Sequence, residues 1–188
     1  MRLILASQSP RRLELLARLG VVPDAVIPAD IDETAMKGEL PVVYAQRVAA
    51  AKVAAVAEPG ALTLAADVVV AAGRRILPKA ETEAAARDCL ALLSGRRHRV
   101  HCAVTLIDGA GTARHRLSSS IVTFKRLSAE EVEAYLATGD WRGKAGGYAI
   151  QGRAEALIRA LSGSFSGVMG LPVYETRALL RAAGYPLG

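Results

Sequence analysis

The first twenty residues constrain the fold most, because they predict a short buried strand that runs directly into a helix. Residues 3–6 are apolar, and a polar turn, Ser7-Gln8-Ser9, follows them. Ser9 suits an N-cap, Pro10 suits the first helical position, and Gly20 can end the helix in a left-handed conformation. A turn of this kind leaves free N–H groups at the start of the helix.

Arg11 and Arg12 lie in the first turn of this predicted helix, where the helix dipole disfavours cations. A phosphate group would interact favourably with both the free N–H groups and the guanidinium groups. The alternative is a capped helix with two solvated arginines. This segment alone leaves both interpretations open.

The composition is that of one folded domain spanning residues 1–188, with room for two lobes. The hydrophobic fraction is 52% and the aromatic fraction 4%, so the core must consist mainly of Ala, Leu and Val. Cys89 and Cys102 lack metal-site spacing, and we expect reduced, buried thiols. Apolar runs are too short to cross a bilayer, and the start has no signal-peptide pattern. We therefore expect no membrane association and a cytoplasmic location.

The net charge of +6 favours an anionic partner, either a nucleic acid or a phosphorylated small molecule. The basic residues occur as scattered pairs rather than as one run or one helix face. Aromatic side chains that could stack on bases are also few. These two features argue against a general single-strand binder.

Periodicity predicts a mixed α/β sheet with an antiparallel central portion. We expect helices at residues 10–19, 42–57, 81–93, 128–138 and 173–183. We expect strands at residues 3–6, 61–72, 97–107 and 113–125, and a short apolar element at 154–161. Gly73 starts a predicted hairpin turn, and Ser128 with Glu131 forms a capping-box pattern. The segments 25–43, 140–152 and 162–170 are predicted to be irregular, and the last two are rich in Gly or Gly and Ser.

Asp67 stands inside an apolar strand pattern, where an unpaired carboxylate would be very costly. It must be paired, bound to metal, or close to a cleft; the alternative is a strand end that binds backbone N–H groups. We favour the functional interpretation. Asp30, Asp32 and Glu33 form a second acidic cluster, and carboxylates from two loops can hold Mg²⁺ beside phosphates. An acidic loop alone is more often only solvated.

Other polar residues are weaker candidates when each is taken singly. Lys52, on an Ala-rich helix, can be a lysine whose stem lies along the core, and Lys79, in a predicted loop, can be solvated or can bind phosphate. The glycines of residues 143–152 allow close backbone approach to a ligand, and Gln151 could pair with a nucleobase edge. The alternative is a flexible surface connection. We interpret the histidines as structural or exposed, namely His98, His101 and His115.

Taken together, the segments resemble the Maf family of nucleoside triphosphate pyrophosphatases. The matching segments occur in family order over almost the whole chain, which makes the match far more specific than any one motif. They are LASQSPRR at 5–12, DE at 32–33, AAAK at 49–52, AD at 66–67, LLSG at 92–95, KAGGYAIQG at 144–152 and GLP at 170–172.

The resemblance implies an inosine triphosphatase-like fold, with a mixed twisted sheet and two lobes around a cleft. It implies hydrolysis of a nucleoside triphosphate to the monophosphate and pyrophosphate with a divalent cation, Mg²⁺ or Mn²⁺, and it suggests a homodimer. Asp67 matches the family's catalytic base, and Glu33, with Asp67, would hold the metal. Arg11 and Gln151 match positions tied to nucleotide choice. The matching polar positions of the cleft are Ser7, Arg12, Glu33, Lys52 and Lys79.

The chain departs from the family pattern in three places. Val68 replaces the usual Thr at a substrate-choice position, Ala80 replaces the Pro after Lys79, and residues 166–169 lack the usual Asn. Residues 150–152 resemble the branch that prefers dTTP and UTP. We therefore expect a pyrophosphatase that favours pyrimidine triphosphates, including modified ones, and forms no stable complex with nucleic acid. A nucleic-acid-binding module and a cell-division regulator are the alternatives, and neither needs the carboxylates or the Gly-rich loop.

Overall fold

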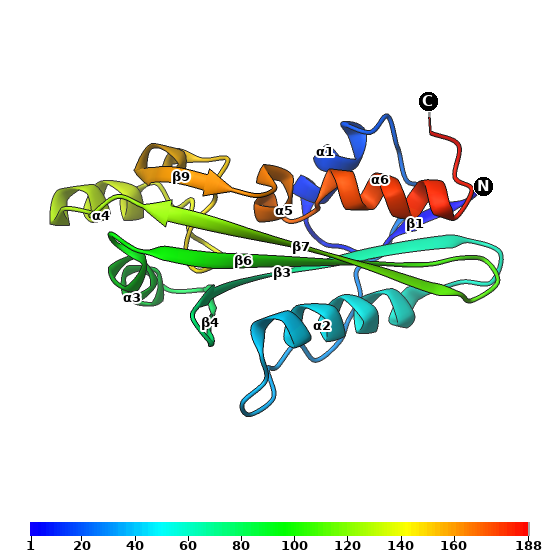
Figure 1. The fold of residues 1–188 in the computed structure, drawn as a ribbon, viewed down its shortest axis with the longest axis horizontal. Coiled ribbons are helices and arrows are strands. Elements are labelled where there is room, and N and C mark those ends of the chain that lie inside the picture. The colour runs from blue at the N-terminus through cyan, green and yellow to red at the C-terminus, as the bar shows by residue number, and fades with distance from the viewer. Residues whose placement is uncertain (188) are drawn as a thin grey trace.

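The structure is a computed structural model that describes residues 1–187, and its centre is a long mixed β-sheet (Figure 1). Three long strands form antiparallel pairs at the middle of the sheet: β3 (Leu62–Ala72), β6 (Arg97–Ile107) and β7 (Ala113–Phe124). The shorter strands are β1 (Leu3–Leu5), β2 (Ala25–Val26), β4 (Arg75–Leu77) and β9 (Ile158–Ser162). The order is β2-β1-β3-β6-β7-β9, with β4 paired to β3, and β1 runs parallel to both of its neighbours.

Helices cover both faces of this sheet. One face of β3 and β6 carries α2 (Pro41–Val56), and the other side carries α1 (Pro10–Ala17), α5 (Phe165–Met169) and α6 (Val173–Ala182) (Figure 1). At the end away from both termini lie α3 (Glu83–Leu93), α4 (Ala129–Ala137) and the 3₁₀-helix η1 (Arg153–Leu157). A separate two-stranded sheet pairs β5 (Lys79–Ala80) with β8 (Lys144–Ala145).

Small side chains bring α2 close to the sheet. Ala45 and Ala49 of α2 pack against Val69 of β3 and Ala103 of β6. Residues 45, 49 and 52 share one helix face, and residues 67 and 69 share one strand face. Packing of these two faces therefore brings the side chain of Lys52 to Asp67.

Most predicted elements are confirmed. The helices and strands predicted at 42–57, 61–72, 81–93, 97–107 and 113–125 agree with the structure to within two residues. The capping box is present: Ser128 Oγ accepts from the Glu131 N–H at 3.2 Å, and Glu131 Oε2 accepts from the Ser128 N–H at 2.9 Å. The turn at Gly73 joins β3 to β4, with a φ of +62°.

Other predictions are wrong in detail. Residues 162–170 include α5, because Ser164 Oγ accepts from the Gly167 N–H at 2.9 Å and caps a short helix. Lys79 lies in β5 rather than in a loop, because it pairs with Ala145 of the distant Gly-rich loop. The segment 25–43 contains β2. Ser9 occupies the N-cap position of α1, but its side chain makes no capping hydrogen bond.

The cysteines are buried, and each histidine ring contacts a hydroxyl group of a neighbouring residue. Cys89 and Cys102 are buried free thiols. His98 Nε2 lies 2.8 Å from the hydroxyl of Tyr148, and His101 Nδ1 lies 2.8 Å from Ser119 Oγ. A similar contact of 2.9 Å joins His115 Nδ1 to Thr105 Oγ1. Within residues 1–187, α2 is the longest helix, and no helix has the length and apolar character needed to cross a bilayer.

Candidate active site

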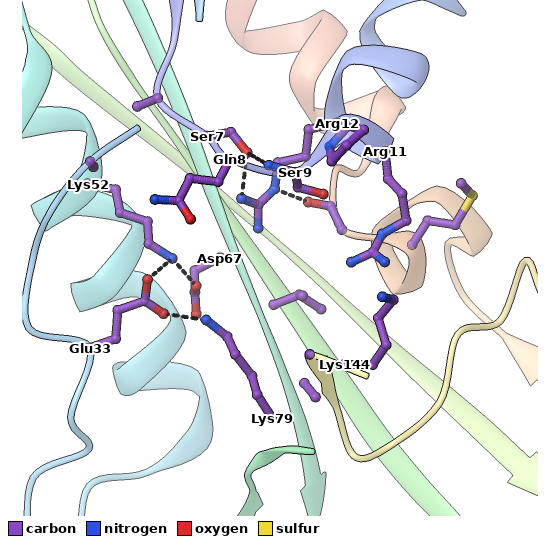
Figure 2. A pocket seen from close by; sticks show the side chains of 18 of the residues that line it. Ser7, Gln8, Ser9, Arg11, Arg12, Glu33, Lys52, Asp67, Lys79 and Lys144 are labelled. Atoms are coloured by element: carbon purple, nitrogen blue, oxygen red, sulfur yellow. Dashed lines mark hydrogen bonds and ion pairs between the residues drawn. The ribbon is translucent and has the colours of Figure 1, made fainter. Parts of the chain in front are cut away.

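A cleft of about 360 Å³ brings together segments from most of the chain. Its walls come from the β1–α1 turn, the loop before α2, α2 itself, β3, β5, the Gly-rich loop and the end of α5 (Figure 2). Eight predicted site residues line it: Ser7, Arg11, Arg12, Glu33, Lys52, Asp67, Val68 and Lys79. Sequence reasoning assigned no role to Gln8, Arg142 or Lys144, which also line it.

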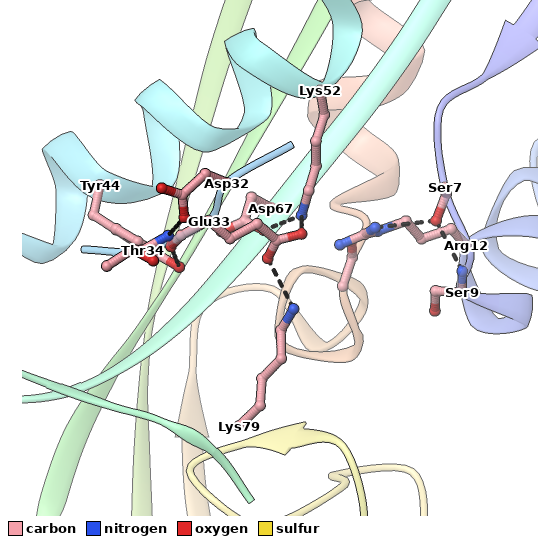
Figure 3. A network of polar contacts seen from close by, with 11 residues as sticks. Ser7, Ser9, Arg12, Asp32, Glu33, Thr34, Tyr44, Lys52, Asp67 and Lys79 are labelled. Carbon is pink, nitrogen blue, oxygen red and sulfur yellow. Dashed lines mark hydrogen bonds and ion pairs between the residues drawn. The ribbon is translucent and has the colours of Figure 1, made fainter. Parts of the chain in front are cut away.

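Arg12 is buried and fixes two walls of the cleft to each other. Its Nε donates to the carbonyl oxygen of Gly170 at 2.9 Å, and its Nη1 donates to Ser7 Oγ at 3.0 Å. Ser7 Oγ also accepts from the N–H of Ser9 at 3.0 Å, which holds the turn before α1 (Figure 3). The hydroxyl that orders this turn is thus that of Ser7, not that of Ser9.

Arg11 points into the cleft toward Lys144, which comes from the Gly-rich loop (Figure 2). Within the described residues, the buried Nε of Arg11 has no hydrogen-bond partner. Burial, and then the charge of Arg12, lower the pKa of Arg11; burial, and then Arg11, lower the pKa of Lys144. Two cations that face each other in this way favour binding of an anion between them. The arrangement therefore favours phosphate binding by Arg11 over a solvated Arg11.

A chain of ion pairs joins the two predicted carboxylates. Lys52 Nζ lies 2.7 Å from Asp67 Oδ1 and 2.8 Å from Glu33 Oε1, and Lys79 Nζ lies 2.8 Å from Glu33 Oε2 (Figures 2 and 3). Asp67 is only 3% exposed. Burial raises the pKa of Asp67, although Lys52 opposes the shift. Burial would also raise the pKa of Glu33, but hydrogen bonds from both lysines bring it below its usual value.

The rest of the acidic cluster does not join this network. The exposed carboxylate of Asp32 accepts from the N–H of Thr34 at 2.8 Å and only stabilises its own loop. Two residues that sequence reasoning missed hold that loop on α2. Tyr44 Oη donates to the carbonyl oxygen of Glu33 at 2.9 Å, and Arg47 Nη2 donates to that of Thr34 at 3.1 Å. Tyr44 lies two helical turns before Lys52 on the same face of α2, and that spacing was the available clue.

The residues present fit a divalent cation that takes most of its ligands from phosphate and water. Within residues 1–187, no group of three or more His, Cys, Asp or Glu side chains could hold a metal ion. Glu33 and Asp67 supply two carboxylates that already share one cation. Mg²⁺ in proteins is commonly held by one or two carboxylates together with substrate phosphates.

A small side recess of about 30 Å³ opens beside the cleft. It brings together Arg11, Val68 and Gln151, the residues that the resemblance tied to nucleotide choice. Its further lining was not predicted and includes Val70, Tyr148, Val168 and Met169. His98 and Phe124 pack against the ring of Tyr148 from behind, so this wall is firmly supported.

The Gly-rich loop is packed against the sheet. Gly146 has a φ of +68°, and a Cβ atom there would lie 2.8 Å from Val70 Cγ1, closer than real Cβ atoms approach. The N–H of Gly146 donates to the carbonyl oxygen of Pro78 at 3.0 Å. Residues 146–150 are buried, so this part of the loop is not a flexible surface connection, and Gly146 and Gly147 serve close packing.

Known proteins resemble the chain over nearly its full length. A protein of Novosphingobium aromaticivorans named dTTP/UTP pyrophosphatase is 64% identical over 97% of this chain and 92% of its own length. One of the same name in Zymomonas mobilis is 61% identical over 98% of this chain and 93% of its own.

The fold also has a counterpart among solved structures. A HAM1 protein from Coxiella burnetii superposes with a TM-score of 0.53 at 18% identity, over 97% of this chain and 99% of that one. This likeness, with the mixed sheet and its flanking helices, confirms the predicted fold class. The family model for Maf-like proteins matches residues 2–183. By this match and by the identity to its relatives, the chain belongs to the Maf family.

Proposed function

We propose that this chain hydrolyses nucleoside triphosphates, with preference for dTTP and UTP, to the monophosphate and pyrophosphate. Relatives that match this chain over nearly their whole length are named dTTP/UTP pyrophosphatase. The observation that carries the proposal is the buried Asp67 in the wall of a cationic cleft, next in sequence to Val68, which lines both the cleft and the small side recess.

Charge supports a triphosphate as the ligand of the cleft. Six cationic side chains and two carboxylates line it, which is a net charge of +4. A triphosphate chain carries about four negative charges near neutral pH, because its terminal phosphate carries nearly two. The cationic residues are Arg11, Arg12, Lys52, Lys79, Arg142 and Lys144.

Asp67 is the proposed general base. Its Oδ1 accepts from Lys52, and its carboxylate lines the cleft, where the second oxygen would accept from a water molecule. The water would lose a proton to Asp67, bond to the α-phosphorus, and displace pyrophosphate as the bond to the bridging oxygen breaks. The cleft lysines and arginines would stabilise charge on the leaving pyrophosphate.

A divalent cation, Mg²⁺ or Mn²⁺, belongs to this proposal. Glu33 and Asp67 would hold it next to the phosphates, and when bound it would neutralise charge on the reacting oxygens. The small side recess offers Gln151 as a donor and acceptor for the edge of a base, and the preference for dTTP and UTP rests on the names of the relatives. The homodimer and the cytoplasmic location remain predictions.

The test is pyrophosphate release from a panel of triphosphates: dTTP, UTP, CTP, ATP and GTP, together with C5-modified pyrimidines. The panel is run with Mg²⁺, with Mn²⁺ and with chelator. We expect metal-dependent release that is fastest with dTTP and UTP. Release that favours purines would contradict the proposed preference, and no release from a folded protein would contradict the activity itself.

Replacing Val68 with threonine should raise kcat/KM for UTP by roughly fivefold, because one hydrogen bond contributes about 1 kcal/mol. Val68 lies between the cleft and the side recess, where a hydroxyl would add one polar contact to the nucleotide. Steady-state kinetics with the panel measures the change. Val168→Thr is the matched control, since Val168 lines the recess without lining the cleft. An equal rise in both variants would show that position 68 has no special role.

A further inference from the structure

The shared ion pairs of Lys52 bear on how metal reaches this site. We propose that, in the free protein, the ammonium group of Lys52 takes the position between Glu33 and Asp67 that a divalent cation would need. The metal would then enter only together with the nucleotide. This inference rests on the proposed function and deepens it.

The geometry supplies the first step. Lys52 Nζ contacts one oxygen of each carboxylate, at 2.8 Å and 2.7 Å, so it already bridges the pair (Figure 3). The side chains of Lys52 and Asp67 are only 8% and 5% exposed, so water screens this pair weakly. A cation that bridged the same oxygens would have to displace the ammonium group and leave a buried charge without its partners, which is strongly unfavourable.

Charge balance supplies the second step. Lys52, Lys79, Glu33 and Asp67 together are neutral, and the whole cleft is already positive because of its other cations. A bare divalent cation would add two positive charges to a positive cleft. A bound triphosphate offsets the positive charge of the cleft. Its oxygens can pair with both the divalent cation and a displaced Lys52.

Ligand number supplies the third step. The two carboxylates would leave most of the coordination sphere of Mg²⁺ or Mn²⁺ to be filled. Phosphate oxygens can fill those positions and can also receive the lysine. The nucleotide would thus supply both the missing ligands and the new partner that releases Glu33 and Asp67.

The experiment measures Mn²⁺ binding by electron paramagnetic resonance, which counts free Mn²⁺ without any turnover. The full-length protein is titrated alone and with an excess of α,β-methylene-dUTP, whose carbon bridge replaces the scissile oxygen. Mn²⁺ binding to the analogue alone is subtracted, and analogue binding is also measured without metal. We expect Mn²⁺ to bind the analogue complex about tenfold to a hundredfold more tightly than it binds the free protein.

Lys52→Met and Lys52→Gln test the role of the lysine directly. We expect each to raise the Mn²⁺ affinity of the free protein by about tenfold or more, because the carboxylates lose their competing cation. Lys125→Met is the matched control, since Lys125 pairs with Glu131 outside the lining of the cleft. Circular dichroism checks that each variant is folded. If a variant does not fold, the comparison of Mn²⁺ binding to the wild-type protein with and without the analogue still tests the inference.

The outcomes separate the inference from the function on which it rests. Equal Mn²⁺ affinity with and without the analogue would overturn the inference alone, as would unchanged affinity in folded Lys52 variants. An analogue that binds neither with nor without Mn²⁺ would overturn the proposed function, and the inference with it.

Discussion

Asp67→Asn should lower kcat/KM for pyrophosphate release by roughly 10²- to 10⁴-fold, the usual contribution of a general base. The amide nitrogen and oxygen cannot take a proton from water at neutral pH. The amide oxygen can still accept from Lys52, now 2.7 Å from Oδ1, so the side chain should keep its position. Release of pyrophosphate from UTP under saturating metal measures the change.

The fold should survive this substitution. Burial raises the pKa of Asp67, which means that the surroundings of this side chain favour its uncharged form. A neutral amide at this position should therefore be tolerated. Lys52 keeps Glu33 as its partner. Asp32→Asn is the control, because Asp32 is exposed, lies next to Glu33 in sequence and contacts only its own loop. Near-normal turnover in Asp67→Asn, or an equal loss in Asp32→Asn, would exclude Asp67 as the base.

Local sequence patterns predicted the helices and strands of this fold well where apolar residues recur at a regular spacing or where a capping residue marks the start of a helix. The capping box of Ser128 and Glu131 begins α4 as expected. The same logic failed at α5, where a five-residue helix is too short to show a period and depends on Ser164. It also failed at β5, since Lys79 becomes a strand only by pairing with residue 145.

The candidate site was predictable residue by residue, but its connections were not. Asp67 stood out because a carboxylate interrupted an apolar strand. Nothing local indicated that Lys52 would join it to Glu33, because that contact depends on how closely α2 packs on β3 through alanines. Gln151 and Arg11 meet at the side recess from distant parts of the chain, and only the family resemblance placed them together in advance.

Gly146→Ala should lower the free energy of unfolding by about 2–5 kcal/mol, from two separable causes. A φ of +68° is unfavourable for an L-residue by roughly 1–2 kcal/mol. The new methyl group would also lie 2.8 Å from Val70 Cγ1, and overpacking of this kind costs about 1–3 kcal/mol. Chemical denaturation measures the loss.

Gly143→Ala separates the two causes, because it shares the backbone strain without the clash. Gly143 has a φ of +65°, and a Cβ atom there has no neighbour within 4 Å. Its loss should therefore be about 1–2 kcal/mol, from backbone strain alone. The difference between the two variants gives the contribution of the contact with Val70.

Val70→Ala in the Gly146→Ala background removes the Cγ atoms that the new methyl group would meet. The double variant should be more stable than the sum of the two single losses predicts, since the clash is then absent. Val70, Ala145 and Tyr148 also line the side recess, so the clash in Gly146→Ala should raise KM for UTP more than it lowers kcat. The double variant should recover part of that KM. Strict additivity of the two losses, with KM unchanged in Gly146→Ala, would show that the close packing of the loop on β3 does not shape the recess.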